Sequence, residues 1–152
     1  MFNIGMYGGS FDPLHMGHIQ DIIRASSMCH ELHVILSYSK TRDNVFYKQR
    51  WQWLVEATKE LENVKLHAVE DQEADKETYD WEKGAMQIKK TINKPIDVVF
   101  CGDDYKNTGR FESLYPASKV IYFDRSVVNI SSTEIRKNPL KYWDYLPKCV
   151  RP

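Results

Sequence analysis

Two histidines close a short segment whose residue types suit the binding of an anion. The segment runs from Gly8 to His18 and reads GGSFDPLHMGH. Gly8 and Gly9 allow a sharp turn and the close approach of a ligand to the backbone. His15 and His18 stand three residues apart, so both can face one point at the start of a helix. Imidazoles placed there can donate hydrogen bonds to phosphate oxygens and stabilise charge that develops in a transition state.

A second segment near the other end of the chain combines hydroxyl and basic side chains. Residues 129–136 read NISSTEIR. Its hydroxyl groups are good helix N-caps, and Glu134 follows Ser131 by three residues, as in a capping box. Capping alone is therefore one interpretation. The other is a polyphosphate site, because a hydroxyl-rich helix start with Arg136 one turn inside suits a chain of phosphates.

The first segment does not match two common phosphate-binding motifs. It is neither the GxGxxG of an ordinary dinucleotide fold nor the GxxxxGK[ST] of a P-loop. Spacing alone would also allow zinc to be bound by His15 and His18 together with His30 and His33. No cysteine or acidic ligand joins these histidines, so the zinc site ranks below the phosphate site.

The rest of the chain predicts alternating strands and helices. Apolar runs predict strands at 4–7, 32–36, 64–69, 96–101 and 120–123. Helical spacing predicts helices at 17–28, 47–61, around 81–92, 131–137 and 139–146, the last with Asn138 as N-cap and Pro139 at N1.

These elements predict the fold class. Strands that are apolar on both faces and separated by amphipathic helices imply a parallel sheet covered on both sides. The prediction is an α/β fold with a Rossmann-like, doubly wound, five-stranded parallel sheet and helices on both faces. Ligands of such sheets bind outside the carboxyl ends of the strands, at the topological switch point. Asp103, after the fourth predicted strand, lies at that edge, where it could contact a ribose or form a turn.

Composition favours one globular domain without a broad electrostatic partner. The 152 residues include 21 Lys+Arg and 21 Asp+Glu, so the formal charge is zero. This length suits a single domain spanning residues 1–152, and the apolar content excludes disorder of the whole chain. Nucleic acid and anionic membranes prefer a basic excess, so neither is expected as a partner. The polar run at 70–77, EDQEADKE, is expected to be a solvated loop.

Apolar run lengths and cysteine usage favour a cytoplasmic protein. No apolar run approaches the roughly 20 residues of a membrane-spanning helix, and the N-terminus lacks the pattern of a secretory signal. Cys29, Cys101 and Cys149 are odd in number and far apart, which gives neither a disulfide framework nor a zinc ribbon. Cys101 is expected to be a buried structural thiol.

The two polar segments resemble the motifs of a known superfamily. GSFDPLHMGH resembles the (T/H)xGH signature of the nucleotidyltransferase α/β phosphodiesterases, and NISSTEIR resembles their second motif, ISxTxxR, which holds the ATP triphosphate. That superfamily transfers a nucleotidyl group from ATP or CTP to a phosphate and releases pyrophosphate. The resemblance implies catalytic roles for His15 and His18. With Asp103 added by topology, the expected ATP-binding residues are Gly8, Gly9, Ser10, Phe11, His15, His18, Asp103, Ile130, Ser131, Ser132, Thr133 and Arg136.

Most of the chain is similar to the adenylyltransferase domain of NadR-type proteins. The similar stretches are HELHVILSYSKTRD, QRWQWLVEATKEL and residues 129–152, whereas residues 70–77 and 103–119 match weakly. The first loop is also close to that of stand-alone nucleotide adenylyltransferases. No Walker motif occurs and no helix-turn-helix precedes Met1, so the kinase and repressor roles of some relatives are not expected.

This resemblance implies a nicotinamide mononucleotide adenylyltransferase, with ATP and nicotinamide mononucleotide as ligands and NAD as product. Mg²⁺ would be bound mainly by the ATP phosphates, without protein ligands. Lys40, Arg42 and Arg50 are candidates for the acceptor phosphate. Trp81 aligns with a tryptophan that stacks on nicotinamide in the family. Because Trp81 also shares a helical face with Ala85, core packing is its other interpretation.

Several alternatives stay open at this stage. The acceptor could be nicotinate mononucleotide, phosphopantetheine or another phosphate. A CTP-using enzyme is less expected, since those members carry a different second motif. A non-catalytic nucleotide sensor is possible, although the presence of His15, His18 and Arg136 argues against it. The chain could also form a homo-oligomer, because its tyrosines and tryptophans could include an interface.

Overall fold

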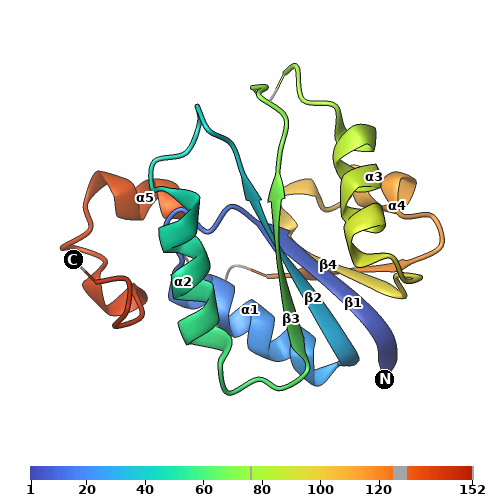
Figure 1. Cartoon of the computed structure of the whole chain (residues 1–152), viewed down its shortest axis with the longest axis horizontal. Coiled ribbons are helices and arrows are strands. Elements are labelled where there is room, and N and C mark those ends of the chain that lie inside the picture. The colour runs from blue at the N-terminus through green and yellow to red at the C-terminus, as the bar shows by residue number, and fades with distance from the viewer. Residues whose placement is uncertain (76, 125–129, 152) are drawn as a thin grey trace.

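Five parallel strands form a single sheet in the computed structural model, which describes residues 1–75, 77–124 and 130–151. The strands are β1 (Phe2–Gly9), β2 (Cys29–Tyr38), β3 (Val64–Glu70), β4 (Val98–Gly102) and β5 (Lys119–Phe123), in the order β3-β2-β1-β4-β5 (Figure 1). All four neighbouring pairs are parallel. The order reverses between β1 and β4, which makes this pair the switch point where a ligand is expected.

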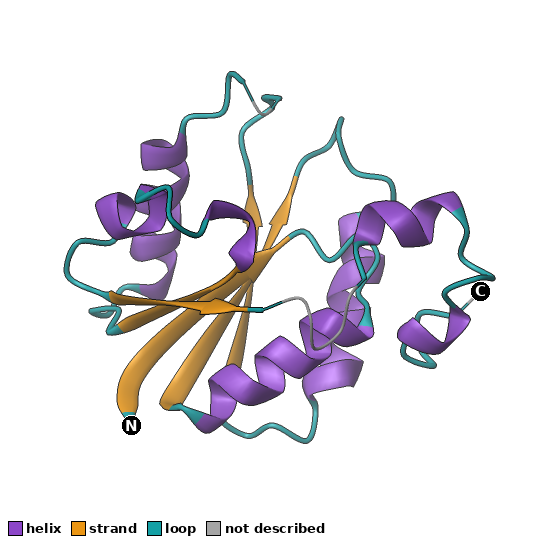
Figure 2. Cartoon of the chain, turned by 180° about the vertical axis from the view of Figure 1, so that it is seen from behind, coloured by secondary structure: helices purple, strands orange, loops and turns teal. Residues whose placement is uncertain are grey.

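Helices cover both faces of the sheet, as the sequence predicts. The α-helices are α1 (Met16–Ser27), α2 (Tyr47–Thr58), α3 (Trp81–Ile92), α4 (Arg110–Leu114) and α5 (Ser132–Lys137). Figures 1 and 2 show α1 and α2 on one side of the sheet and α3 and α4 on the other. The doubly wound α/β architecture is therefore confirmed.

Each face of the sheet contributes to its own apolar cluster. Val34 of β2 packs in one cluster with Ile22 of α1 and Leu54 of α2. Its neighbour Ile35 packs in the other cluster with Ala85 of α3. Because successive side chains of a strand point to opposite faces, a strand covered on both sides must be apolar at every position. This requirement explains the uninterrupted run of apolar residues in β2.

The C-terminal segment packs on the core but is not the predicted α-helix. Instead of a helix over 139–146, it forms turns and one 3₁₀ turn, η2 (Trp143–Tyr145). Asn138 is the C-cap of α5, and its side-chain oxygen accepts a hydrogen bond from Lys141 N at 3.2 Å. The chain then turns to bury Leu146 and Val150 against the first cluster. These contacts at Asn138, Leu146 and Val150 take the place of the predicted helix.

The segment between β4 and β5 also contains structure that its polarity did not predict. A 3₁₀ turn, η1 (Asp103–Tyr105), follows β4 directly, and the short α4 follows Gly109. Gly109 adopts a φ of 74°, in the left-handed region that glycine enters readily. This glycine lets the chain turn before α4 begins.

Cys101 is a buried thiol, as the sequence predicts. All three cysteines are free, and both Cys29 and Cys101 are buried. Burial raises the pKa of Cys101 to about 12, so its reactive thiolate form is suppressed near neutral pH.

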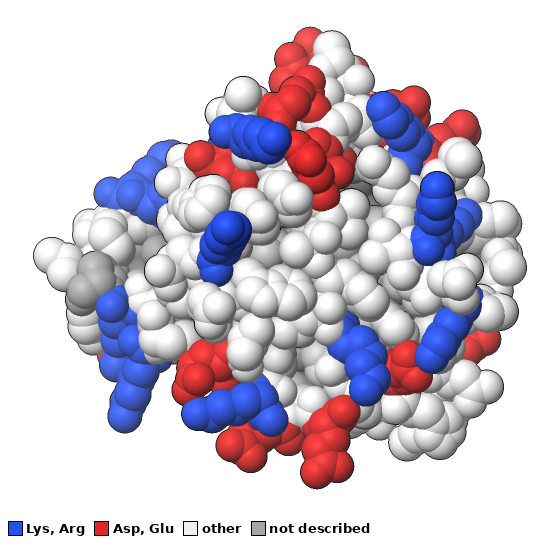
Figure 3. Space-filling view, viewed as in Figure 1, with Lys and Arg blue, Asp and Glu red and all other residues white. Residues whose placement is uncertain are grey.

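Both acidic and basic side chains are spread over the face of the molecule shown in Figure 3. On the face shown in Figure 3, acidic groups gather above the end of β3, where the run 70–77 follows that strand. Most of this run lies outside regular structure, as its composition predicts. Among the described residues, no helix is long and apolar enough to cross a membrane.

A histidine pair on β2 and β3 predicts that acid destabilises the fold. His33 Nδ1 lies 2.7 Å from His67 Nε2, and His33 Nε2 lies 2.7 Å from a carboxylate oxygen of Glu31. Burial lowers the pKa of both histidines, although Glu31 opposes this shift for His33. As the pH falls below the ordinary histidine pKa of about 6.5, the unfolded chain binds protons that the folded chain resists. The free energy of unfolding should therefore decrease between pH 7.5 and pH 5.

Urea unfolding at several pH values checks this expectation. His67→Gln should flatten the decrease in unfolding free energy below pH 6.5, because it removes one of the two rings whose pKa is lowered in the folded protein. His30→Gln is the matched control, since His30 is exposed. An unchanged pH slope in His67→Gln would show that this pair does not govern acid sensitivity.

Candidate active site

A cavity of about 700 Å³ opens at the carboxyl ends of β1 and β4. It therefore occupies the switch point of the sheet, where such folds bind ligands. Most of the predicted ATP-binding residues line it: Gly8, Gly9, Ser10, His15, His18, Ile130, Ser131, Ser132, Thr133 and Arg136. Trp81, predicted for the acceptor, lines the same cavity. This cavity therefore brings together segments from both ends of the chain.

The two histidines form the start of α1. His15 is the N-cap, and its Nδ1 accepts hydrogen bonds from Gly17 N at 3.1 Å and His18 N at 3.4 Å. His18 Nδ1 in turn accepts from His15 N at 3.2 Å. The rings stack with centroids 3.6 Å apart. The spacing of three residues thus produces a capping box made of two imidazoles.

This capping box also determines which ring nitrogens can donate. A neutral imidazole has one acceptor and one donor nitrogen, and both Nδ1 atoms accept backbone hydrogen bonds. We therefore assign the proton of each neutral ring to Nε2, on the edge away from the helix backbone. Two N–H donors beside a helix N-terminus form a suitable binding site for phosphate oxygens.

Gly17 is needed because the His15 ring folds back over it. A Cβ atom at position 17 would lie 2.9 Å from Cε1 of that ring, closer than real contacts allow. The glycine of the HxGH motif therefore makes room for the cap.

The second polar segment is attached directly to the first loop. Ser131 is the N-cap of α5 and accepts from Glu134 N at 3.2 Å. Ser132 Oγ donates to the carbonyl of Pro13 at 3.0 Å. The Arg136 guanidinium donates to the carbonyl of Asp12 and, at 3.3 Å, to the Thr133 hydroxyl. These bonds join the two motifs into one wall of the cavity. Asn129, the first residue of the motif, lies outside the described residues.

Asp12 connects this wall to the segment after β2. Its carboxylate is buried and accepts from Asn44 N at 2.9 Å, Asn44 Nδ2 at 3.1 Å and Val45 N at 3.0 Å. Since the Asp12 carbonyl also binds Arg136, a single residue contacts both neighbouring segments. The aspartate of GSFDP therefore has a structural role that its position in a turn did not indicate.

Arg50 does not lie where the sequence prediction placed it. The side chain is fully buried, and its guanidinium donates to Val45 O at 2.9 Å, to Ser10 O at 2.6 Å and to Asp43. Its donors bond to the first loop and to the segment after β2, and Arg50 is not among the residues that line the cavity, so the structure does not place it where the sequence prediction needs it. The fold inserts this arginine beneath the loop that lines the cavity.

Lys40 and Arg42 lie outside the cavity lining. Lys40 is exposed, with its ammonium 3.6 Å from Glu70. Arg42 is partly exposed and lies 3.8 Å from Asp71, which accepts a hydrogen bond from the hydroxyl of Tyr79, a residue of the lining. Arg42 is therefore connected to the cavity wall through Asp71 and Tyr79, whereas the ammonium of Lys40 pairs with Glu70.

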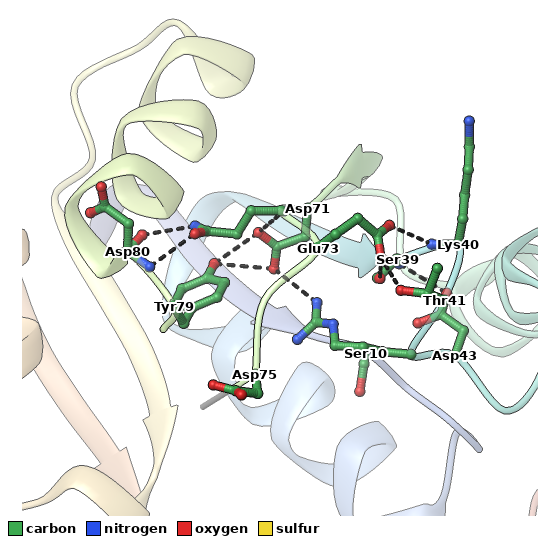
Figure 4. A network of polar contacts seen from close by, with 12 residues as sticks. Ser10, Ser39, Lys40, Thr41, Asp43, Asp71, Glu73, Asp75, Tyr79 and Asp80 are labelled. Carbon is green, nitrogen blue, oxygen red and sulfur yellow. Dashed lines mark hydrogen bonds and ion pairs between the residues drawn. The ribbon is translucent and has the colours of Figure 1, made fainter. Parts of the chain in front are cut away.

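A polar network joins the loops after β2 and β3 (Figure 4). Glu73 accepts hydrogen bonds from Ser39 Oγ at 2.8 Å, from Lys40 N at 3.0 Å and from the Thr41 hydroxyl. These bonds lower the pKa of Glu73, because they stabilise its ionised form. The network holds the loop that carries Arg42 against the loop after β3.

Trp81 packs against other aromatic side chains at the start of α3. Asp80 caps α3 by accepting from Lys83 N at 3.1 Å, and this places Trp81 in the first turn. The indole lies edge-to-face with Tyr79, Tyr105 and Phe111 at centroid distances of 5.1, 5.2 and 6.2 Å. Trp81 thus belongs to an aromatic cluster and also borders the cavity.

Two predicted ATP-binding residues occupy other positions. Phe11 is buried, and its ring packs against Gly9 and edge-on to His18 at 4.9 Å. Its side chain therefore packs in the core behind the His18 ring and does not line the cavity. Asp103 begins η1, whereas the lining includes its neighbour Asp104. The turn after β4 directs the second of the two aspartates toward the cavity.

The sequence interpretation missed several residues of the lining. Tyr7 donates to Asp21 at 3.1 Å, and both border the cavity with Tyr79 and Tyr105. Asp21 follows His18 by three residues on α1, so helical spacing could have identified it. Tyr79 and Tyr105 lie in polar segments between the predicted elements, where no periodic signal exists.

Comparison with known proteins identifies the family of this chain. The model of the family described as cytidylyltransferase-like matches residues 6–138. The trifunctional NAD biosynthesis/regulator protein NadR of Salmonella typhimurium is 31% identical over 164 residues, and a phosphopantetheine adenylyltransferase of Streptococcus gordonii is 28% identical over 155 residues. The alignments cover 99% and 97% of this chain, but 40% and 90% of the respective relatives. The chain thus spans less than half the length of the NadR relative.

Solved structures support the same fold. A NadR protein in complex with NR superposes with a TM-score of 0.75 at 24% identity, covering 98% of this chain and 44% of that one. A bifunctional NMN adenylyltransferase/ADP ribose pyrophosphatase from Francisella tularensis gives a TM-score of 0.68 at 17% identity, covering 100% of this chain and 46% of that one. With its Rossmann-like sheet, its HxGH helix start and the match over residues 6–138, the chain belongs to the cytidylyltransferase-like family.

Proposed function

We propose that this chain is a nicotinamide mononucleotide adenylyltransferase, which transfers AMP from ATP to nicotinamide mononucleotide and forms NAD and pyrophosphate. The observation that carries this proposal is the joining of the HxGH helix start to the ISSTxxR segment around one cavity. Its volume lies within the range of roughly 300–1,000 Å³ that is usual for small-molecule sites. The likeness to NadR along nearly the whole chain supports the pyridine acceptor.

The reaction we propose is a direct in-line displacement. A phosphate oxygen of the acceptor forms a bond to the α-phosphorus of ATP. The bond from that phosphorus to the bridging oxygen breaks, and its electron pair leaves with pyrophosphate. An acceptor phosphate is already an anion at neutral pH, so no general base is required. Catalysis then depends on positioning and on the stabilisation of developing charge.

The residues of the cavity wall divide these tasks. His18 Nε2–H would donate to the α-phosphate as charge develops on its oxygens. The β- and γ-phosphates would be held by the donors His15, Ser132, Thr133 and Arg136. The carbonyl–guanidinium bond between Asp12 and Arg136 keeps the triphosphate end of the site aligned with the histidines.

Mg²⁺ is proposed to enter the site with ATP. Among the residues that the structure describes, no group of three or more His, Cys, Asp or Glu side chains could hold a metal ion. We therefore propose that Mg²⁺ is bound chiefly by the phosphate oxygens of ATP. Such an ion would neutralise part of the charge on the triphosphate and on the leaving pyrophosphate.

The acceptor would occupy the aromatic end of the cavity. We propose that its ring stacks on Trp81 and that Arg42, with Lys40, binds its phosphate after the Arg42 side chain turns from Asp71.

A second candidate for the acceptor is phosphopantetheine. The alignment with a phosphopantetheine adenylyltransferase that covers 90% of that enzyme favours it.

Pyrophosphate release decides between these functions. The full chain is incubated with ATP and Mg²⁺ and one acceptor at a time: nicotinamide mononucleotide, nicotinate mononucleotide or phosphopantetheine. We expect release with nicotinamide mononucleotide, together with stoichiometric NAD. Release with phosphopantetheine alone would establish the second candidate. ATP binding without release with any acceptor would instead indicate a nucleotide sensor.

A further inference from the structure

A guanidinium group lies over two aromatic side chains of the cavity lining. Arg110, the first residue of α4, places Cζ 4.6 Å from the ring centroid of Trp81 and 5.1 Å from that of Tyr105. At the start of α4, the backbone N–H of Arg110 donates to Thr108 Oγ1 at 3.2 Å. The arginine thus contacts the tryptophan on which the pyridine ring of the acceptor is proposed to stack.

Within the described part of the chain, Arg110 forms no ion pair with an acidic side chain. Glu112, two residues later, accepts instead from the Tyr122 hydroxyl at 2.6 Å. Arg110 is exposed, so its guanidinium can leave the rings at small cost. Its contacts are with the electron-rich faces of aromatic rings, which attract any cation placed there.

A pyridine nucleotide brings its own charge to this position. The ring nitrogen bonded to ribose is a cation, so nicotinamide competes with the guanidinium for the face of Trp81. A nicotinate ring carries the same cation and also a carboxylate. That carboxylate can accept paired hydrogen bonds from the displaced guanidinium, which is the geometry that arginine prefers.

We propose that Arg110 determines specificity between the two pyridine mononucleotides by disfavouring the amide form and favouring the acid form. This inference rests on the proposed function, because it requires a pyridine acceptor on Trp81. Arg110 competes with nicotinamide for one aromatic face and becomes a binding partner for nicotinate. The residue lies in the 103–119 segment, where resemblance to NadR-type sequences is weak.

The test compares kcat/KM for both mononucleotides in the wild type and in Arg110→Ala. We expect the substitution to raise the value for nicotinamide mononucleotide and lower that for nicotinate mononucleotide, so that their ratio changes by about tenfold. Lys106→Ala is the matched control, since it removes a positive charge from the same exposed segment. It should leave the ratio unchanged. Where one mononucleotide is not turned over, its inhibition constant against the other replaces kcat/KM.

Two failures can be told apart. Equal changes for both mononucleotides in Arg110→Ala would overturn the specificity role and leave the proposed function intact. A wild-type chain that releases pyrophosphate with neither mononucleotide would overturn the proposed function, and the role of Arg110 with it. Arg110→Lys adds a further check: it retains the charge without the paired donors, so kcat/KM for nicotinate mononucleotide should fall while competition with nicotinamide persists.

Discussion

Replacing His18 with alanine should lower kcat for AMP transfer by roughly 100- to 1,000-fold, with ATP affinity changed only severalfold. The reason is that Nε2–H of His18 would bind the α-phosphate most strongly when negative charge develops there. The other triphosphate donors remain in the variant, so the ground-state complex with ATP persists. Steady-state kinetics with nicotinamide mononucleotide measure the first quantity, and calorimetric titration with ATP measures the second.

The structural role of His18 requires a matched variant. His18 Nδ1 accepts a hydrogen bond from His15 N, so alanine also removes part of the helix cap. Asparagine can place an oxygen near the Nδ1 position but has no group at Nε2. We expect His18→Asn to regain the stability lost in His18→Ala while its turnover stays low. Turnover close to that of the wild type in either variant would refute the assignment of His18 as a catalytic residue.

Replacing Arg50 with alanine should reduce the free energy of unfolding by about 3–5 kcal/mol, the usual cost of removing one partner of a buried ion pair. The loss would leave the carbonyls of Ser10 and Val45 without their donors and Asp43 without its cation. Because Ser10 lines the cavity, weaker ATP binding should accompany the loss. Urea denaturation and ATP titration measure the two effects.

Arg42→Ala provides the comparison within the same region. Arg42 is 43% exposed and lies 3.8 Å from Asp71, so its ion pair is worth at most about 1 kcal/mol. We expect little loss of stability in this variant and a higher KM for the acceptor. Equal destabilisation by the two substitutions would contradict the structural role assigned to Arg50.

The order of elements and the histidine pair were predictable because their signals are local. A strand covered on both faces is apolar at every position, and a helix start depends on residues within one turn. For this reason the sheet, α1 to α3 and the proximity of His15 to His18 follow from neighbouring residues. The 139–146 helix failed where a longer-range requirement, the burial of Leu146 and Val150, took precedence over local capping signals.

The amino-acid sequence by itself determined the α/β fold, and it singled out the two polar segments and predicted that they meet at one sheet edge. Only the tertiary structure decided which polar side chains are available there. Arg42 and Arg50 have similar places in the sequence, yet one is partly exposed and the other is buried beneath Ser10. Arg136 reaches Asp12 across 124 positions, and Arg110 reaches Trp81 from another element. Burial and hydrogen bonding depend on partners far along the chain, which local periodicity does not specify.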